Sequence, residues 1–114
     1  MKVPVCVKVR LKDAPFLLYM VQIKENSILA RIAAKKLKAD KVAMVIGKTI
    51  YLHNTTRADF LLDARWVKHE MAHVEQYRQH GIMKFLLLYT WYSIKYGYYN
   101  NPFEIEAREK EKSL

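Results

Sequence analysis

The sequence predicts an α+β domain in which a small sheet with one helix precedes three further helices. Short apolar runs typical of strands lie in the first half of the chain, where Pro and Gly interrupt them. The second half contains three segments with helical signals, separated by Gly81 and Gly97. The chain has 114 residues, of which 52% are hydrophobic, so we expect a single domain over residues 1–114 with its own core.

Strand structure is expected near the N-terminus. Residues 3–11 partly alternate between apolar and polar side chains and predict a strand, with Pro4 near its start. Residues 16–23 are apolar and fit either a second strand or a short helix. The first 15 residues contain no uninterrupted apolar segment of the kind that signal peptides have.

A helix is predicted over residues 27–38, with Asn26 or Ser27 as its N-cap. Its apolar residues share one side, which contains Ile28, Ile32, Ala33 and Leu37. Residues 41–53 follow, and their apolar runs predict either two short strands that turn at Gly47-Lys48 or one bent strand.

The second half opens with Thr56-Arg57-Ala58-Asp59, whose spacing is close to that of a capping box. It predicts a long helix over residues 57–80, which Gly81 ends. A second helix is predicted over Ile82–Tyr96 and a third from Asn101-Pro102, where Asn caps and Pro takes the first helical position.

The helix over Ile82–Tyr96 is apolar nearly all round, which allows two interpretations. It is either a buried helix packed under its predecessor or a surface for a membrane or a hydrophobic partner. Lys84, Thr90, Ser93 and Lys95 interrupt it, so no stretch reaches the roughly 20 apolar residues that a membrane span needs.

The formal net charge is +9, which permits attraction to nucleic acid, anionic lipid or acidic proteins. The basic residues are spread along the chain, and we interpret the densest group, Lys35 to Lys41, as the solvated end of a helix. No helix-turn-helix or RNA-binding motif is present, so we expect no nucleic-acid partner. Cys6 is the only cysteine, which excludes an intrachain disulfide and, with no signal peptide, predicts a cytoplasmic protein.

The sharpest functional signal is His69-Glu70-Met71-Ala72-His73. Histidines four residues apart on a helix lie on one face, so both imidazoles can bind the same zinc ion. Glu70 can then act as general base on a zinc-bound water. The alternative is a pair of ordinary helical histidines, but the motif lies mid-helix among apolar neighbours, where a buried pair needs partners.

A catalytic zinc site needs a third protein ligand, and the candidates are Glu104, Glu106, His80, His53 and Glu75. His80 lies two turns beyond His73, too far along a straight helix, and Glu75 points to another side. The third ligand is therefore expected on the third helix, where helix geometry does not distinguish between Glu104 and Glu106. Glu104 has a structural alternative as well, because a Glu three residues after the cap commonly bonds back to the cap.

Together, HEMAH and the later Glu104-Ile105-Glu106-Ala107 resemble the gluzincin branch of the zincin metallopeptidases, over about residues 41–108. HEMAHVEQY and YYNNPFEIEA are similar more narrowly to small bacterial metallopeptidase-like domains, including one from the core of extracellular contractile injection systems. The resemblance implies a minimal zincin-like fold, a Zn²⁺ cofactor and Glu104 as third ligand. Arg108 stands where the family has Asp or Asn, so the usual carboxylate beside the ligands is absent there.

The resemblance further implies a peptidase that acts on a peptide or protein, and it places Thr49–His53 as the edge strand that lines the cleft. Two other functions stay open: a weak or inactive interaction module on the zincin fold, and a basic binder of nucleic acid or membrane surfaces. Several side chains could stabilise an oxyanion, and the sequence does not choose among Tyr96, Tyr98, Tyr99, His80 and His53.

Overall fold

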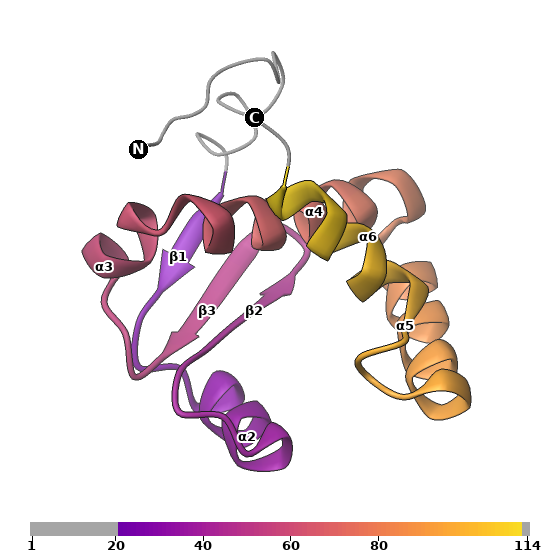
Figure 1. The fold of residues 1–114 in the computed structure, drawn as a ribbon, viewed down its shortest axis with the longest axis horizontal. Coiled ribbons are helices and arrows are strands. Elements are labelled where there is room, and N and C mark those ends of the chain that lie inside the picture. Colours follow the sequence, from indigo (N-terminus) through magenta and orange to yellow (C-terminus); the bar gives the residue numbers. More distant parts are fainter. Residues whose placement is uncertain (1–20, 113–114) are drawn as a thin grey trace.

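The computed structural model describes residues 21–112 and confirms the α+β class. Figure 1 shows its elements, which are β1 (Gln22–Lys24), α2 (Ile28–Leu37), β2 (Val42–Ile46), β3 (Thr49–His53), α3 (Arg57–Leu62), α4 (Ala64–His80), α5 (Ile82–Tyr96) and α6 (Pro102–Glu111). The predicted strand at residues 3–11, Cys6 and residues 16–20 lie outside the described residues. The end of segment 16–23 belongs to β1 and is therefore a strand.

The three strands form a mixed sheet in the order β1-β3-β2. β2 and β3 pair antiparallel, from Val42 opposite His53 to Ile46 opposite Thr49, which confirms the two-strand interpretation of residues 41–53. Gly47 makes the turn with a φ of 65°, a conformation that glycine adopts without steric cost. β1 pairs in parallel with the other side of β3.

This order corrects the expectation that Thr49–His53 is an edge strand. β3 is central because β1 occupies its second side, and β2 is the edge strand nearer to α4. The resemblance concerned chain order, and chain order cannot show that a strand earlier in the sequence returns to cover an edge. Among the strands of residues 21–112, the sheet edge beside α4 therefore belongs to β2.

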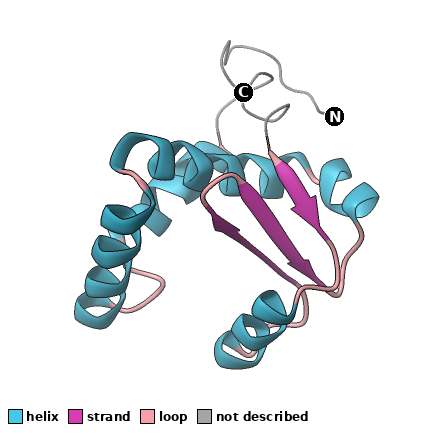
Figure 2. Cartoon of the chain, turned by 180° about the vertical axis from the view of Figure 1, so that it is seen from behind, coloured by secondary structure: helices cyan, strands magenta, loops and turns pink. Residues whose placement is uncertain are grey.

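The two faces of the sheet pack against different helices (Figure 2). Ile50 and Leu52 of β3 are fully buried in the main core with Phe60, Val74 and residues of α4 and α5. Tyr51, which alternates with them, contacts the smaller cluster under α2. The sheet thus holds α4 in place from one face while α2 covers the other.

The side of α2 that packs on the sheet is not the predicted apolar side. Ser27 is the N-cap, as expected, and its hydroxyl accepts from the amide of Ala30. Ala30 and Ala34 are buried, whereas the branched residues Ile28 and Ile32 are exposed. Small alanine side chains let the helix backbone approach the sheet closely, so steric fit outweighed side-chain hydrophobicity here.

The predicted single helix over residues 57–80 is two helices, α3 and α4, which meet at Asp63. Asp63 has an extended backbone, and its carboxylate accepts from the amide of Trp66 as the N-cap of α4. Thr56 caps α3 as predicted, by accepting from the amide of Asp59. Because an aspartate side chain competes well for free backbone amides, it favours a new helix start over continuation.

α5 is mostly exposed, which is contrary to its interpretation as a buried helix. Phe85 is its one fully buried residue and lies against Tyr77 of α4. In Figure 1, α5 projects from the end of α4, away from the sheet. Within residues 21–112, no helix is long and apolar enough to cross a membrane.

α6 returns beside α4 and makes its most extensive contact with that helix. Asn101 is the N-cap and Pro102 the first residue, as predicted. The fully buried Asn101 side chain accepts from the amide of Phe103, and it donates to the carbonyl of Tyr89 and to the hydroxyl of Ser93. These bonds tie the start of α6 to α5 and fix which α6 residues face α4.

Candidate metal centre

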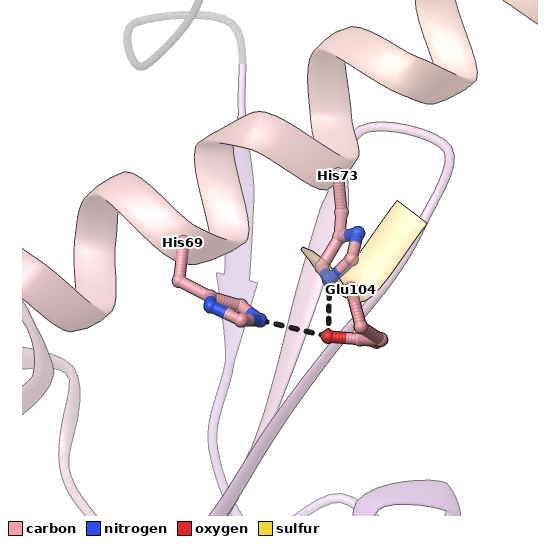
Figure 3. A group of neighbouring side chains, drawn as sticks. All are labelled: His69, His73 and Glu104. Atoms are coloured by element: carbon pink, nitrogen blue, oxygen red, sulfur yellow. Dashed lines mark hydrogen bonds and ion pairs between the residues drawn. The ribbon is translucent and has the colours of Figure 1, made fainter. Parts of the chain in front are cut away.

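The packing of α4 against α6 brings together His69, His73 and Glu104, the three side chains predicted as metal ligands (Figure 3). One potential ligand atom from each lies within 4.8 Å of the others. Oε1 of Glu104 lies 2.9 Å from Nε2 of His69 and 3.3 Å from Nε2 of His73. Among residues 21–112 this is the one such group of three.

Local sequence explains how each side chain arrives there. His69 and His73 are one turn apart on α4, so both imidazoles project from the same face. Glu104 lies in the first turn of α6, three residues after its cap Asn101. Its carboxylate points to the two imidazoles in Figure 3, so the alternative in which Glu104 bonds back to the cap is not realised.

Two of the three separations between donor atoms suit a tetrahedral ion, and all three lie within 4.8 Å. Zinc bonds of about 2.0–2.1 Å place neighbouring ligand atoms about 3.3 Å apart in a tetrahedron. The two nitrogen–oxygen distances at Glu104, 2.9 and 3.3 Å, are close to that separation. Two imidazoles and one carboxylate are a donor set that zinc favours, and they leave a fourth position open. The residues present therefore fit a catalytic type of zinc site.

A hydrogen-bonded chain orients His73. Its Nδ1 lies 2.8 Å from Oε1 of Gln76, and Nε2 of Gln76 donates to Oε1 of Glu106 at 2.6 Å. The Gln76 amide also donates to the carbonyl of Phe103. With Nδ1–H donated to Gln76, Nε2 of His73 is the nitrogen left for a metal. Glu106, the open alternative for the third ligand, belongs to this supporting chain and not to the group of three.

His69 is oriented in the same manner by a carboxylate from the end of α6. Its Nδ1 lies 2.5 Å from Oε2 of Glu111, whose other oxygen is 3.5 Å from a guanidinium nitrogen of Arg65. Arg108, at the family's Asp or Asn position, is turned away: it donates to the carbonyl of Tyr99 and lies over that residue's ring. The supporting carboxylate is therefore present, three residues further along the helix.

Sequence reasoning missed Gln76, Glu111 and Tyr89. The first two carried a usable signal: Gln76 lies three residues after His73, and Glu111 seven residues, about two turns, after Glu104 on the same side of α6. The Tyr89 hydroxyl donates a short hydrogen bond to Oε2 of Glu104. Tyr89 gave no signal, because only the fold of α5 against α6 brings it to Glu104.

The site concentrates charge in a buried setting and shifts the pKa of several groups. Burial raises the pKa of Glu70 to about 7. Burial alone would lower the pKa of His73, but its hydrogen bond to Glu104 and that carboxylate's charge raise it to about 9. Burial alone would raise the pKa of Glu104. The pKa nevertheless lies well below its usual range, because both imidazoles and Tyr89 donate hydrogen bonds to its carboxylate.

A surface hollow of about 430 Å³ borders the group of three at His69. His69 and Glu70 form part of its wall, and Val42 and Ala43 of the edge strand β2 line the other side. Tyr98 also lines it, and burial with the nearby charge of Glu104 raises the pKa of its hydroxyl. A molecule in this hollow would touch His69, Glu70 and the edge strand.

The remaining candidates lie elsewhere. His80 packs against the rings of Phe85 and Phe103, and Glu75 forms an ion pair with Arg78. His53 pairs with Val42 at the end of β3. Of the five candidates for an oxyanion donor, Tyr98 alone lines the hollow.

Comparison with protein-family models, with curated proteins and with solved structures found no match for this chain.

Proposed function

We propose that this protein is a zinc-dependent hydrolase that acts on the amide bond of a peptide or protein, within a minimal zincin-like fold. The observation that carries the proposal is the convergence of His69, His73 and Glu104 beside the buried carboxyl group of Glu70. The supporting bonds from Gln76 and Glu111 strengthen it, because metal-binding histidines usually donate their second ring nitrogen to such partners.

His69 and His73 would hold the ion through Nε2, and Glu104 would hold it through a carboxylate oxygen. A zinc ion bound here would supply Lewis acidity, which lowers the pKa of water and polarises a carbonyl group. Tyr89 restrains the second oxygen of Glu104, so the ligand carboxylate is held in one orientation. The chain thus prepares the donor set before the ion arrives.

Glu70 is the proposed general base. It follows His69 directly, lines the hollow and is not a member of the ligand group. Burial raises its pKa to about 7, so the carboxyl group can take up and release a proton near neutral pH. In amide hydrolysis it would accept the proton of the attacking water and pass it to the leaving nitrogen.

Within residues 21–112, no strand pairs with the outer edge of β2, and this edge supports an extended peptide as the substrate. Its backbone groups border the hollow at Val42 and Ala43, and an unpaired strand edge can hydrogen-bond to another extended chain. A substrate bound this way would have its carbonyl groups beside His69 and Glu70. In this proposal β2 is the edge strand that binds the substrate, in place of Thr49–His53.

Metal content measured by mass spectrometry on untagged protein tests the proposal first. We expect about one zinc ion per chain, lost in His73→Ala and reduced in Glu104→Ala. Glu109→Ala is the matched control, since Glu109 is on the exposed side of α6 and pairs with Lys112. Zinc retained equally in all three variants, or absent from the wild type after supplementation, would overturn the assignment of the site.

Activity is tested separately with a peptide library and zinc-loaded protein. We expect cleavage by the wild type and none above background by Glu70→Gln at equal zinc content. If zinc binds as proposed but no peptide or other amide is cleaved, the hydrolase proposal fails, and the zinc-holding interaction module takes its place.

A further inference from the structure

The outer side of α5 carries a continuous apolar stripe, which we define as Met83, Leu87, Trp91 and Ile94. Their exposed fractions are 72%, 69%, 56% and 75%. They recur every three or four residues and therefore lie along one side of the helix over its whole length. Phe85 and Tyr89 lie on the opposite side and contact the rest of the protein.

This exposure is not explained by the metal centre. The inner side of α5 supplies Tyr89 to Glu104 and Phe85 to the core, so the helix is held without the stripe. Soluble monomers rarely expose a contiguous apolar surface of several large side chains, and such a surface usually marks an interaction site. We therefore expect the stripe to bind a partner whose contacting surface is apolar.

The charge around the stripe indicates which occupant. Residues 81–103 include Lys84 and Lys95 and contain no Asp or Glu, within a chain of net charge +9. Both lysines are exposed, and their alkyl stems can lie along apolar surface while the ammonium groups reach outward. The complementary surface is therefore apolar inside and negatively charged at its boundary.

Exposed tyrosines also lie at the C-terminal end of α5 and just beyond it. Tyr96 and Tyr99 follow Trp91 in the sequence and are exposed, and Trp and Tyr are the side chains enriched at the boundary between membrane and water. α5 has 15 residues, so it is too short to span a bilayer and would lie in its plane.

We propose that α5 binds the surface of an anionic lipid bilayer, with the stripe inserted among the acyl chains and Lys84 and Lys95 at the headgroups. The exposed apolar residues of α2 fit this role less well. On α2 the side that starts with Ile28 and Ile32 continues with Lys35 and Lys36, so its apolar part ends within about two turns. The membrane site goes beyond the proposed hydrolase activity and does not depend on it.

Co-sedimentation of the full chain with vesicles tests this proposal. The vesicles are phosphatidylcholine alone or phosphatidylcholine with phosphatidylglycerol, at low and high salt. We expect binding to the anionic vesicles, at least about tenfold weaker on pure phosphatidylcholine and weakened by salt. A blue shift of the tryptophan emission should accompany binding in the wild type and largely disappear in Trp91→Phe, since Trp66 lies in the core region.

The decisive pair of variants replaces two exposed apolar residues on each of two helices. Leu87→Ser with Trp91→Ser should weaken vesicle binding about tenfold or more, whereas Ile28→Ser with Ile32→Ser should change it less than about twofold. Circular dichroism and thermal midpoints confirm that both variants fold. Lys84→Glu with Lys95→Glu tests the charge without altering the stripe and should also weaken binding to anionic vesicles.

Three results would overturn the proposal. The first is no binding of the wild type to anionic vesicles. The second is an equal loss of vesicle binding in the α2 double variant and the α5 double variant. The third is a dimer in solution that the α5 variant abolishes while vesicles fail to bind the wild type, because the stripe would then be an interface between two copies of the chain.

Discussion

The amide oxygen of Gln76 lies 2.8 Å from Nδ1 of His73, one turn earlier on α4, and leaves Nε2 of that histidine directed at Glu104. Gln76 is in turn held by Glu106 and by the carbonyl of Phe103, both on α6. A single amide therefore links the orientation of a proposed ligand to the packing of the two helices that form the site. This relationship makes the first prediction possible.

Gln76→Ala should weaken zinc binding by about 10–100-fold, because a ligand histidine that loses its second hydrogen bond is no longer fixed in tautomer or orientation. Competition with a chromophoric chelator measures the affinity. Gln79→Ala is the control, since Gln79 is on α4 but bonds only to the surface residue Glu75 among the bonds described. Equal affinities in the two variants would show that the amide does not position His73.

Glu70→Gln should keep the zinc content of the wild type while lowering kcat/KM by about 10²–10⁴-fold, because glutamine fills the same space but cannot accept a proton. The readout is cleavage of a peptide identified with the wild type, at matched zinc occupancy. Because burial raises the pKa of Glu70, kcat/KM in the wild type should rise with pH as this carboxyl ionises. A variant that retains full activity would exclude Glu70 as the base.

The metal-free protein should lose stability as the pH rises from 6.5 to about 9. The pKa of His73 is about 9 in the folded protein, against an ordinary value of 6.5. Its ion pair with Glu104 therefore stabilises the fold fully below pH 6.5, and that contribution disappears as the pH passes through 9. Burial raises the pKa of Glu70 from 4.5 to about 7, so its neutral form stabilises the fold below pH 4.5 and this contribution is lost between pH 4.5 and 7.

Saturating zinc should cancel the part of this dependence that comes from His73, because zinc needs a neutral His73 and must displace the proton. The apparent affinity of the protein for zinc should rise by up to about tenfold per pH unit between pH 6.5 and about 9. Thermal midpoints with zinc and with a chelator, at pH 6.5 and pH 9, measure both effects. In His73→Ala the thermal midpoint with zinc should equal the midpoint with chelator at each pH. A difference that persists would show that zinc binds elsewhere.

Asn101→Ala should destabilise the protein by about 1–3 kcal/mol and also weaken zinc binding. The substitution removes a helix cap and leaves buried partners on α5 without their hydrogen bonds. Because the same bonds fix the first turn of α6, Glu104 loses its defined position. Denaturant unfolding and chelator competition measure the two effects.

Thr56→Ala is the matched control for Asn101→Ala. Thr56 caps α3 by a single exposed bond, so its loss should cost about 1 kcal/mol and leave zinc affinity unchanged. If both variants reduced zinc affinity in proportion to their stability, Asn101 would have no specific role in placing Glu104.

Much of the candidate site follows from local sequence. His69 and His73 share a face because four residues make about one helical turn, and Asn101-Pro102 starts α6 because both residues suit a helix N-terminus. The turn at Gly47 and the cap at Thr56 are equally local. Each of these features depends on interactions within a few residues, which the order of amino acids directly specifies.

Tertiary structure decided which side chains and strands from distant segments contact each other. Glu104 faces the histidines and Glu106 faces Gln76 only because of how α6 rotates against α4. β3 became central because β1 pairs with it, and α5 stayed exposed because a single side of it meets the core. Helix periodicity shows which residues share a side but not which side is buried, and that choice belongs to packing between segments distant in sequence.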